Sequence, residues 1–365
     1  MKLRFMTYNI MHRAESARRR KYFYCASDIL DSGTRLKKVA EEVRKLSPDV
    51  IALQEVDQHA LDFFSHELSS TGLECALSLL NLRLPSKDGC AIFARKDKFE
   101  TIKTHSFRFN DILPTYFGQS VVAGGGSAEA QMFFREIYEK LNLGLVATLA
   151  CRQSGLHVNV ATTHLFWDPK IPDLKLLQAY LLGRELHKYR QSNPAPIILG
   201  GDFNSVPLVD GNQQSEYNQS PEQSNSAGSS SSSCASSSSL ASGVYDLFTQ
   251  GQVAQDHPDH PCARRKKMHG QVPMLRLPQR WRSAYKDVQG CEPKFTNYTA
   301  GFKGCLDYIL MSSVEDVDVR ASAALSLPTE DDLKKEIGLP SSVFPSDHLP
   351  LLAEFELTKQ PLFAL

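Results

Sequence analysis

The sequence predicts an α/β protein built on mixed β-sheets. Apolar runs typical of buried strands alternate with segments of helical periodicity, and one pair of runs is joined by a short turn, which indicates a β-hairpin. Hydrophobic residues make up 42% of the 365-residue chain and charged residues 22%, which is enough for one large globular domain or two smaller ones.

Apolar periodicity predicts the elements of the first half of the chain. Residues 3–10 alternate like a strand, and a helix follows with Thr34 as its cap and Ser47-Pro48 at its end. Residues 49–56 form a nearly continuous apolar run that ends in Gln and Glu, as expected of a buried strand. The next expected elements are a helix around 58–70 and a strand over 89–95.

The second half is predicted in the same way. Two apolar runs flank Gln153-Ser154-Gly155, and we expect them to form a hairpin that ends at His164. The remaining expected elements are a helix over 173–189, a buried strand within 196–205 and two late strands at 305–311 and 349–357.

Two segments interrupt this pattern. Residues 119–128 read as a loop, and residues 211–243 are a polar, Ser-rich stretch that cannot bury a core. We interpret the second as a disordered surface insertion, because candidate catalytic residues lie on both sides of it. The chain is therefore expected to form a single catalytic domain over residues 1–365.

Charge and processing signals limit the partners and the compartment. Lys plus Arg and Asp plus Glu both number 41, so there is no global basic field to attract nucleic acid. The N-terminus has no secretory signal, no apolar stretch reaches the ~18 to 20 residues of a membrane span, and the eight cysteines lack a C-x-x-C pair. These features predict a soluble intracellular protein, cytoplasmic in the first place, with a nuclear or organellar location left open.

Short polar clusters at the ends of the expected strands predict a functional site. Each cluster alone is more typical of a turn, a cap or a solvated side chain, but loops at strand ends often carry function and six such clusters occur together. No Walker loop or dinucleotide-binding glycine motif is present. The clusters are Tyr8-Asn9, Gln54-Glu55, Thr163-His164, Gly201-Asp202-Phe203-Asn204, Leu306-Asp307-Tyr308 and Ser346-Asp347-His348.

The carboxylates and amides in these clusters suit metal-dependent chemistry on a phosphate. Mg²⁺ prefers oxygen ligands and usually takes only one or two protein carboxylates. We expect Glu55 to bind this ion, and Asn9 to bind it directly or through a water. Asp202 is expected to orient or deprotonate the attacking water, and Asn204 to donate its amide to a phosphoryl oxygen.

The histidines and the remaining aspartates complete the predicted site. His164 and His348 are expected to place hydrogen-bond donors on the scissile phosphate, where negative charge builds in the transition state. Asp307 is expected to orient His348, and Asp347 to contact a metal instead.

Other residues leave two interpretations open. Phe295, Tyr298 and Phe302 are candidates for base stacking and equally for sheet packing. Lys175 and Lys303 are interpreted as solvated surface lysines in preference to phosphate contacts.

The motifs around these residues resemble those of the endonuclease/exonuclease/phosphatase superfamily, and of its CCR4-type branch in particular. That branch includes CCR4 deadenylases, nocturnin, Angel proteins and 2′-phosphodiesterase. The matching motifs are TYNI (7–10), DVIALQEVD (49–57), DGCAIFARKDKF (88–99), THLFWDP (163–169), DLKLLQ (173–178), LGGDFNSVP (199–207), SGVYDL (242–247), DHPDH (256–260), FTNYTAGFKGCLDYI (295–309) and FPSDHLPLLAEFE (344–356).

This resemblance implies a fold, an activity and a cofactor. The fold is a two-layer α/β sandwich of two packed mixed sheets flanked by helices. The activity is that of a Mg²⁺-dependent 3′-to-5′ exoribonuclease of the poly(A)-specific deadenylase type, with Mn²⁺ as an alternative ion and nucleoside 5′-monophosphates as products. The branch also implies two enzymatic alternatives, an NADP(H) 2′-phosphatase and a 2′,5′-oligoadenylate phosphodiesterase.

The resemblance also sets expectations about partners. RNA, and poly(A) 3′ ends in particular, is the implied substrate, and no membrane is implied. The chain begins at its first strand, so we expect no leucine-rich-repeat docking region for a CCR4–NOT-type complex, and a monomer. A catalytically silent RNA- or protein-binding module is the non-enzymatic alternative, which the intact carboxylates disfavour.

Overall fold

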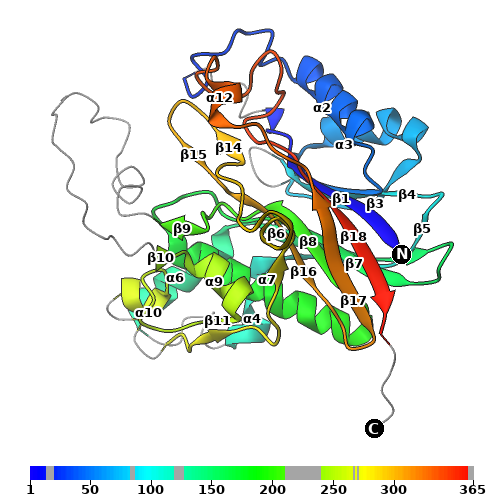
Figure 1. The fold of residues 1–365 in the computed structure, drawn as a ribbon. Helices are drawn as coiled ribbons and strands as arrows, with labels where there is room; N and C mark the ends of the chain where they lie inside the picture. The colour runs from blue at the N-terminus through cyan, green and yellow to red at the C-terminus, as the bar shows by residue number, and fades with distance from the viewer. Residues whose placement is uncertain are drawn as a thin grey trace.

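Two six-stranded β-sheets pack face to face, and helices cover their outer faces (Figure 1). This computed structural model describes residues 1–13, 20–82, 87–118, 127–209, 240–265, 268 and 271–360. An apolar core that includes Phe5 and Ile92 of one sheet and Leu145 and Ile198 of the other lies between the two sheets. The predicted α/β sandwich of two packed sheets is confirmed.

Each sheet is mixed, as predicted, because one parallel pair lies among antiparallel neighbours. In the first sheet β1 and β2 are parallel, and in the second β7 and β8 are. The first sheet has the order β17 (Val317–Ala324), β18 (Leu351–Lys359), β1 (Lys2–Asn9), β2 (Val50–Val56), β4 (Gly89–Arg95) and β3 (Leu73–Leu80). The second has the order β13 (Arg282–Ser283), β16 (Asp307–Ser312), β8 (Ile197–Asp202), β7 (His157–His164), β6 (Leu143–Cys151) and β5 (Phe99–Arg108).

The helices bury their apolar faces against the outer faces of the sheets. One cluster packs α2 and α3 on the first sheet, and another packs α4, α6, α7 and α9 on the second. The helices are α2 (Ser32–Leu46), α3 (Gln58–Glu67), α4 (Phe109–Phe117), α6 (Ala128–Glu139), α7 (Pro172–Ser192), α9 (Gly243–Gln250), α10 (Pro261–Arg264), α11 (Ala284–Gln289) and α12 (Glu330–Leu333), with a 3₁₀ turn at Ser69–Thr71.

Several predicted boundaries need correction. The cap of α2 is Asp31 rather than Thr34, because the Asp31 carboxylate accepts a hydrogen bond of 2.8 Å from the Thr34 backbone N–H. The predicted insertion over 211–243 ends too late, since Leu240–Ala241 form strand β10 and Gly243 begins α9. Residues 211–239, and 119–126 of the other predicted loop, lie outside the described residues, and Ala128 already begins α6.

Sequence periodicity missed β3, β5, β17, α4 and α6, and it missed the short elements at the edges. β3 and β5 lie at the ends of their sheets, where half-exposed side chains blur the apolar signal. The short strands are β9 (Leu208–Val209), β10 (Leu240–Ala241), β11 (Gln252–Val253), β12 (Leu275–Arg276), β14 (Asn297–Tyr298) and β15 (Lys303–Gly304).

The two sheets approach each other closely where β1 crosses β8. A Cβ atom on Gly200 would lie 2.5 Å from a ring carbon of Phe5 and 2.8 Å from the Cβ of Thr7. Only glycine fits at this point without displacing β1. Since β1 ends at Asn9 and β8 at Asp202, this close approach also brings the polar ends of both strands together.

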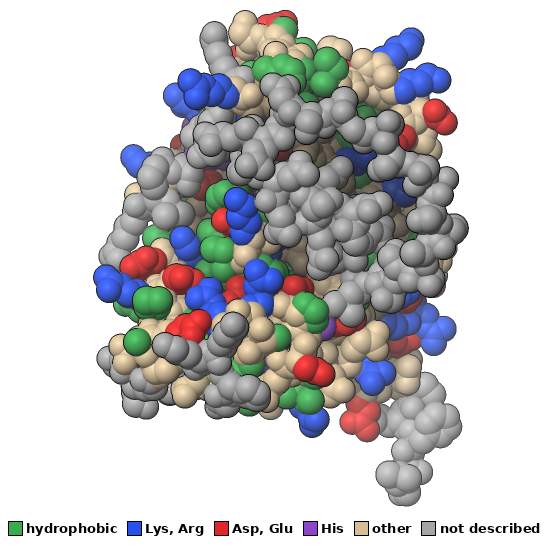
Figure 2. All heavy atoms as spheres, turned by 90° about the vertical axis from the view of Figure 1, so that its left-hand side faces the viewer, with side chains coloured by type: hydrophobic (Ala, Val, Ile, Leu, Met, Phe, Trp, Pro, Cys, Tyr) green, Lys and Arg blue, Asp and Glu red, His purple; other side chains and the backbone are tan. Residues whose placement is uncertain are grey.

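The described surface carries mixed charge. Figure 2 shows basic and acidic side chains interspersed over the face on the left of Figure 1. Oppositely charged side chains also form ion pairs, such as Arg265 with Glu136 at 2.9 Å. Among the described residues, none of the helices combines the length and the apolar character that a membrane crossing requires.

Candidate active site

The register of the second sheet aligns three of the predicted residues in one row. Asp202 at the end of β8 is paired with His164 at the end of β7 and with Asp307 at the start of β16. Because β7 and β8 are parallel and β16 is antiparallel to them, all three side chains lie at the same edge of the sheet. The predicted hairpin that ends at His164 is confirmed by the antiparallel pairing of β6 with β7.

Asn9 joins the two sheets at this edge. Its amide nitrogen donates to Glu55 Oε1 at 2.9 Å and to Asp202 Oδ2 at 3.0 Å. The Asn9 side-chain oxygen accepts from the Met11 backbone N–H at 3.0 Å, which fixes the direction of the amide. Asn9 is fully buried, so these bonds are shielded from water.

An irregularity in β2 directs Glu55 into the site. The pairing of β2 with β4 shifts register between Gln54 and Val56, and Glu55 between them has a left-handed φ of 59°. Such a bulge turns one side chain away from the regular alternation of a strand. The second carboxylate oxygen of Glu55 accepts from the His12 backbone N–H at 2.6 Å.

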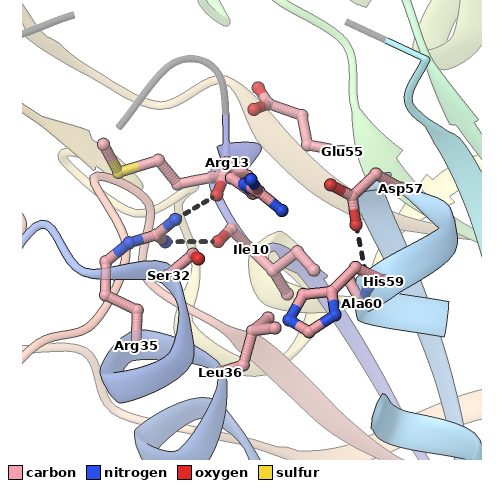
Figure 3. Close-up of a pocket in the computed structure, with 10 residues that line it drawn as sticks. Ile10, Arg13, Ser32, Arg35, Leu36, Glu55, Asp57, His59 and Ala60 are labelled. Atoms are coloured by element: carbon pink, nitrogen blue, oxygen red, sulfur yellow. Dashed lines mark hydrogen bonds between the residues drawn. The ribbon is translucent and has the colours of Figure 1, made fainter. Parts of the chain in front are cut away.

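Arg35 of α2 holds the segment that supplies this backbone N–H (Figure 3). Its guanidinium donates to the carbonyls of Ile10 and Met11 at 2.9 and 2.7 Å. It also donates to the Pro345 carbonyl at 3.2 Å, so it links the end of β1 to the loop before β18. These bonds border a shallow pocket that has Glu55 on its wall.

The charges around Glu55 favour its ionised form. Burial alone would raise the pKa of this carboxyl, but interaction with the His164 imidazole and hydrogen bonds from His12 and Asn9 hold the pKa below its usual value. Glu55 as a residue is half-buried.

Asp202 lies at the centre of the predicted residues. Its Oδ2 is 3.5 Å from His164 Nε2 and 3.7 Å from His348 Nε2, besides the bond from Asn9. Its Oδ1 accepts from the Asn204 backbone N–H at 2.9 Å. Burial, and then the charge of Asp307, raise the pKa of Asp202 above its usual value.

His348 and Asp307 form a buried pair. The distance from His348 Nδ1 to Asp307 Oδ2 is 2.8 Å, and Thr296 donates its hydroxyl to the same oxygen at 2.6 Å. Burial alone would lower the pKa of His348, but the carboxylates of Asp307 and Asp202 raise it to about 10. His348 is therefore an imidazolium at neutral pH, with its Nε2–H facing Asp202.

Asp347 lies beside the other residues but is engaged by a separate segment. Its Oδ2 accepts from the Tyr22 hydroxyl at 2.8 Å and lies 3.5 Å from the ammonium of Lys21. Burial would raise the pKa of Asp347, but Lys21 and His348 lower it. The described contacts of this carboxylate therefore tie residues 21–22 to the site.

Asn204 is held by its backbone and its amide. Its φ is 50°, its Nδ2 donates to the Leu165 carbonyl at 2.9 Å, and its own carbonyl accepts from Lys175 Nζ at 2.7 Å. Lys175 is only 2% exposed, so the interpretation of it as a solvated surface lysine is wrong. Helical periodicity predicts one buried face and one exposed face, so it did not reveal that Lys175 is covered. The whole first half of α7 is buried under α9 and the loop after β8.

Burial decides the interpretation of Phe295 and Lys303, while base stacking by Tyr298 or Phe302 stays a prediction. Phe295 is 3% exposed and packs with Leu339 in a small core, whereas Tyr298 and Phe302 are half-buried. Lys303 forms an ion pair of 2.8 Å with Glu330 and is a partly exposed surface lysine, as expected.

The donor set fits a divalent cation. Candidate ligand atoms of Asp202, Asp307 and His348 lie within 4.8 Å of one another, but an imidazolium has no free lone pair, so the two carboxylates are the available ligands of this group. Among the described residues, Asp307 Oδ1 is buried without a hydrogen-bond partner. With Glu55 and Asp347 added, four carboxylates meet in one buried region, which is the oxygen-rich setting that hard cations prefer.

Sequence reasoning missed the residues that hold the site together. These residues act through contacts with residues distant in the sequence. Thr296 contacts a residue 11 positions away, Tyr22 one 325 positions away, and Arg35 one up to 310 positions away. No local pattern marks them, although Arg35 stands out as a charged residue on the buried side of α2.

Comparison with known proteins places these features in a family. A model of the endonuclease/exonuclease/phosphatase family matches residues 6–348. A "CCR4-Not complex 3'-5'-exoribonuclease subunit Ccr4" from Emericella nidulans is 28% identical over 98% of this chain and 52% of its own length. The same subunit from Aspergillus oryzae is 29% identical over 97% of this chain and 47% of its own length. The chain thus spans about half the length of the curated relatives it matches.

Two solved structures share the fold. The crystal structure of ANGEL2, a 2',3'-cyclic phosphatase, has a TM-score of 0.71 and 24% identity, and the match covers 97% of this chain and 95% of that one. The human nocturnin catalytic domain, with a bound sulfate anion, has a TM-score of 0.60 and 22% identity over 98% of this chain and 94% of its own.

Proposed function

Because this chain belongs to the endonuclease/exonuclease/phosphatase family, we propose that it is a divalent-metal-dependent hydrolase of phosphodiester bonds. The convergence of Asn9, His164 and His348 on Asp202 Oδ2, beside Glu55, is the observation that carries this proposal. The sequence similarity to Ccr4 exoribonuclease subunits favours a 3′-to-5′ exoribonuclease that removes poly(A) and releases nucleoside 5′-monophosphates. Within this proposal the chain acts as a single-domain monomer in the cytoplasm.

The residues divide the chemistry between them. Asp202, with its raised pKa, orients the attacking water and accepts its proton, while Asn9 keeps the Asp202 carboxylate in place. The imidazolium of His348 and the imidazole of His164 donate to the phosphoryl oxygens that gain charge in the transition state. Asp307 keeps His348 charged and correctly oriented, since its carboxylate holds Nδ1.

Glu55 is proposed to hold Mg²⁺, with Mn²⁺ as an alternative ion, and Asn9 and Asp347 are proposed to complete the protein side of the metal site. When bound, the ion neutralises phosphate charge and lowers the pKa of water. Asn9 and the His12 backbone N–H fix the direction of the Glu55 carboxylate, and its lowered pKa keeps it ionised at neutral pH.

The test is hydrolysis of 5′-labelled oligoadenylate by the purified full chain, with Mg²⁺ or with EDTA. We expect stepwise shortening from the 3′ end in Mg²⁺ only, and a loss of at least about 100-fold in Glu55→Ala, because the metal supplies much of the charge stabilisation. Calorimetric titration with Mg²⁺ should show weakened binding in the same variant. Glu74→Ala is the matched control, because Glu74 lies on the edge strand β3 with its side chain 53% exposed.

Four results would contradict parts of the proposal. Near-normal turnover by Glu55→Ala would remove Glu55 from the metal site. Phosphate release from NADPH with intact RNA would indicate a dinucleotide phosphatase, and cleavage restricted to 2′,5′-linked oligoadenylate would indicate a 2′,5′-phosphodiesterase. Binding of RNA without any hydrolysis would indicate a silent binding module.

A further inference from the structure

We propose that Trp167 forms a nucleobase subsite beside the catalytic centre, on which a base of the RNA strand stacks. This inference rests on the proposed function, and it adds a substrate contact that the catalytic residues do not supply. The indole of Trp167 is 66% exposed, although Trp side chains are usually well buried in a folded protein. An aromatic face in water is the surface on which bases stack without regard to sequence.

Trp167 lies close to the scissile position. It follows His164 by three residues, so their Cα atoms are at most about 11 Å apart at 3.3–3.6 Å per residue. A stacked strand advances about 3.4 Å per nucleotide. A base on Trp167 would therefore belong to one of the roughly three nucleotides next to the phosphate that His164 contacts.

The loop that carries Trp167 is held in place by the catalytic loop. The Leu165 backbone N–H donates to the Asp202 carbonyl at 2.9 Å, and the Leu165 carbonyl accepts from Asn204 Nδ2. The Phe166 backbone N–H donates to Gln178 Oε1 at 2.8 Å. The exposed indole is therefore attached to a fixed backbone, so little conformational entropy is lost when a base covers it.

A cation and a second ring lie at the same surface. The ring of Phe166 is 6.0 Å from that of Trp167, and the ammonium of Lys140 lies 4.8 Å from the Phe166 ring centre. Phe166 is mostly buried and supports the loop. Lys140 supplies local positive charge for the phosphates of the RNA strand, although the chain as a whole has no net charge.

The sequence offers a specific optical reporter for this proposal. The chain has only two tryptophans, and the other, Trp281, is 2% exposed and packs against Phe248. Stacking of a base on Trp167 should quench its emission, while Trp281 stays inaccessible. Binding is measured in full-length protein with Mg²⁺ and the Asp202→Asn substitution, which stops turnover, using an eight-nucleotide oligoadenylate and an abasic oligomer of equal length.

We expect oligoadenylate to quench the emission and the abasic oligomer to leave it unchanged. Trp167→Phe should bind within about threefold of the parent without the quench. Trp167→Ala and Trp167→Leu should bind about 5- to 100-fold more weakly by fluorescence anisotropy of labelled RNA, because Leu keeps apolar bulk but has no aromatic face. Ile102→Ala, at a 50% exposed residue on the edge strand β5, is the control and should bind like the parent.

In enzyme that carries no other substitution, Trp167→Ala should raise KM and leave kcat unchanged. Damage to the catalytic loop would instead lower kcat. Absence of the quench, or equal affinity in Trp167→Ala, would overturn the subsite while leaving the hydrolase proposal intact. Quenching by oligoadenylate in a protein that never cleaves RNA would instead support the subsite and refute the exoribonuclease.

Discussion

Lys175→Met is expected to separate stability from activity. Lys175 is buried in α7, and its ammonium donates to the carbonyl of Asn204 at 2.7 Å. Burial lowers the pKa of Lys175 to about 8, although the carboxylates of Asp259 and Asp168 oppose that shift. The charged lysine therefore costs stability, and it also holds the loop that carries Asn204.

The size of this cost follows from the pKa. The shift from 10.5 to about 8 makes the charged form less favourable by roughly 3 kcal/mol in the folded state, at about 1.4 kcal/mol per pKa unit. Below about pH 8 Lys175 is protonated in both the folded and the unfolded chain, so the full cost of burying its charge is present. Between about pH 8 and 10.5 Lys175 is protonated only in the unfolded chain, so the stability of the parent protein rises with pH. Above about pH 10.5 the lysine is neutral in both states and the cost is gone.

The quantity to measure is the unfolding free energy of Lys175→Met minus that of the parent. This difference should fall by roughly 3 kcal/mol from pH 7 to pH 10.5, because only the parent gains stability when its buried lysine loses its proton. Urea unfolding followed by tryptophan emission provides the measurement. Lys188→Met is the control, since Lys188 lies on the same helix with its side chain 62% exposed.

At pH 7 the same variant should lose at least about tenfold in kcat, because the Asn204 carbonyl loses its buried donor and the loop relaxes. A free-energy difference that stays flat between pH 7 and pH 10.5 would refute the assignment of a buried, charged Lys175. Unchanged kcat would refute its hold on Asn204.

Three further predictions test the fold and the site. Asp307→Asn should lower kcat by about 100-fold or more with little change in fold, because His348 loses its orienting charge; a circular dichroism spectrum and turnover on RNA check this. Deleting 214–239, which leaves β10 intact, and bridging the gap should leave the melting temperature and turnover nearly unchanged, since closure entropy changes slowly with loop length; a large loss of either would contradict it. Gly200→Ala should lower the urea midpoint by an amount equivalent to about 1–3 kcal/mol, because its Cβ would overlap Phe5.

The sequence identified the residues of the site better than their connections. His164 and Asp202 each end an apolar strand and Asp307 begins one, a pattern that local periodicity reveals. Their meeting depends on register, because a shift of one residue in β16 would turn Asp307 to the other face of the sheet. The family resemblance, now supported by the match over residues 6–348, predicted that these residues share one site, but not the register that brings them together.

The sequence by itself determined the α/β class, the mixed character of the sheets and the identity of the polar residues at the strand ends, because these follow from local periodicity and residue chemistry. Only the tertiary structure decided that Lys175 is buried, that Arg35 holds the turn under Glu55 and that Trp167 is exposed. The physical reason is that burial depends on contacts between distant segments. A lysine on a helix or a tryptophan in a loop has the same local pattern whether neighbours cover it or water does.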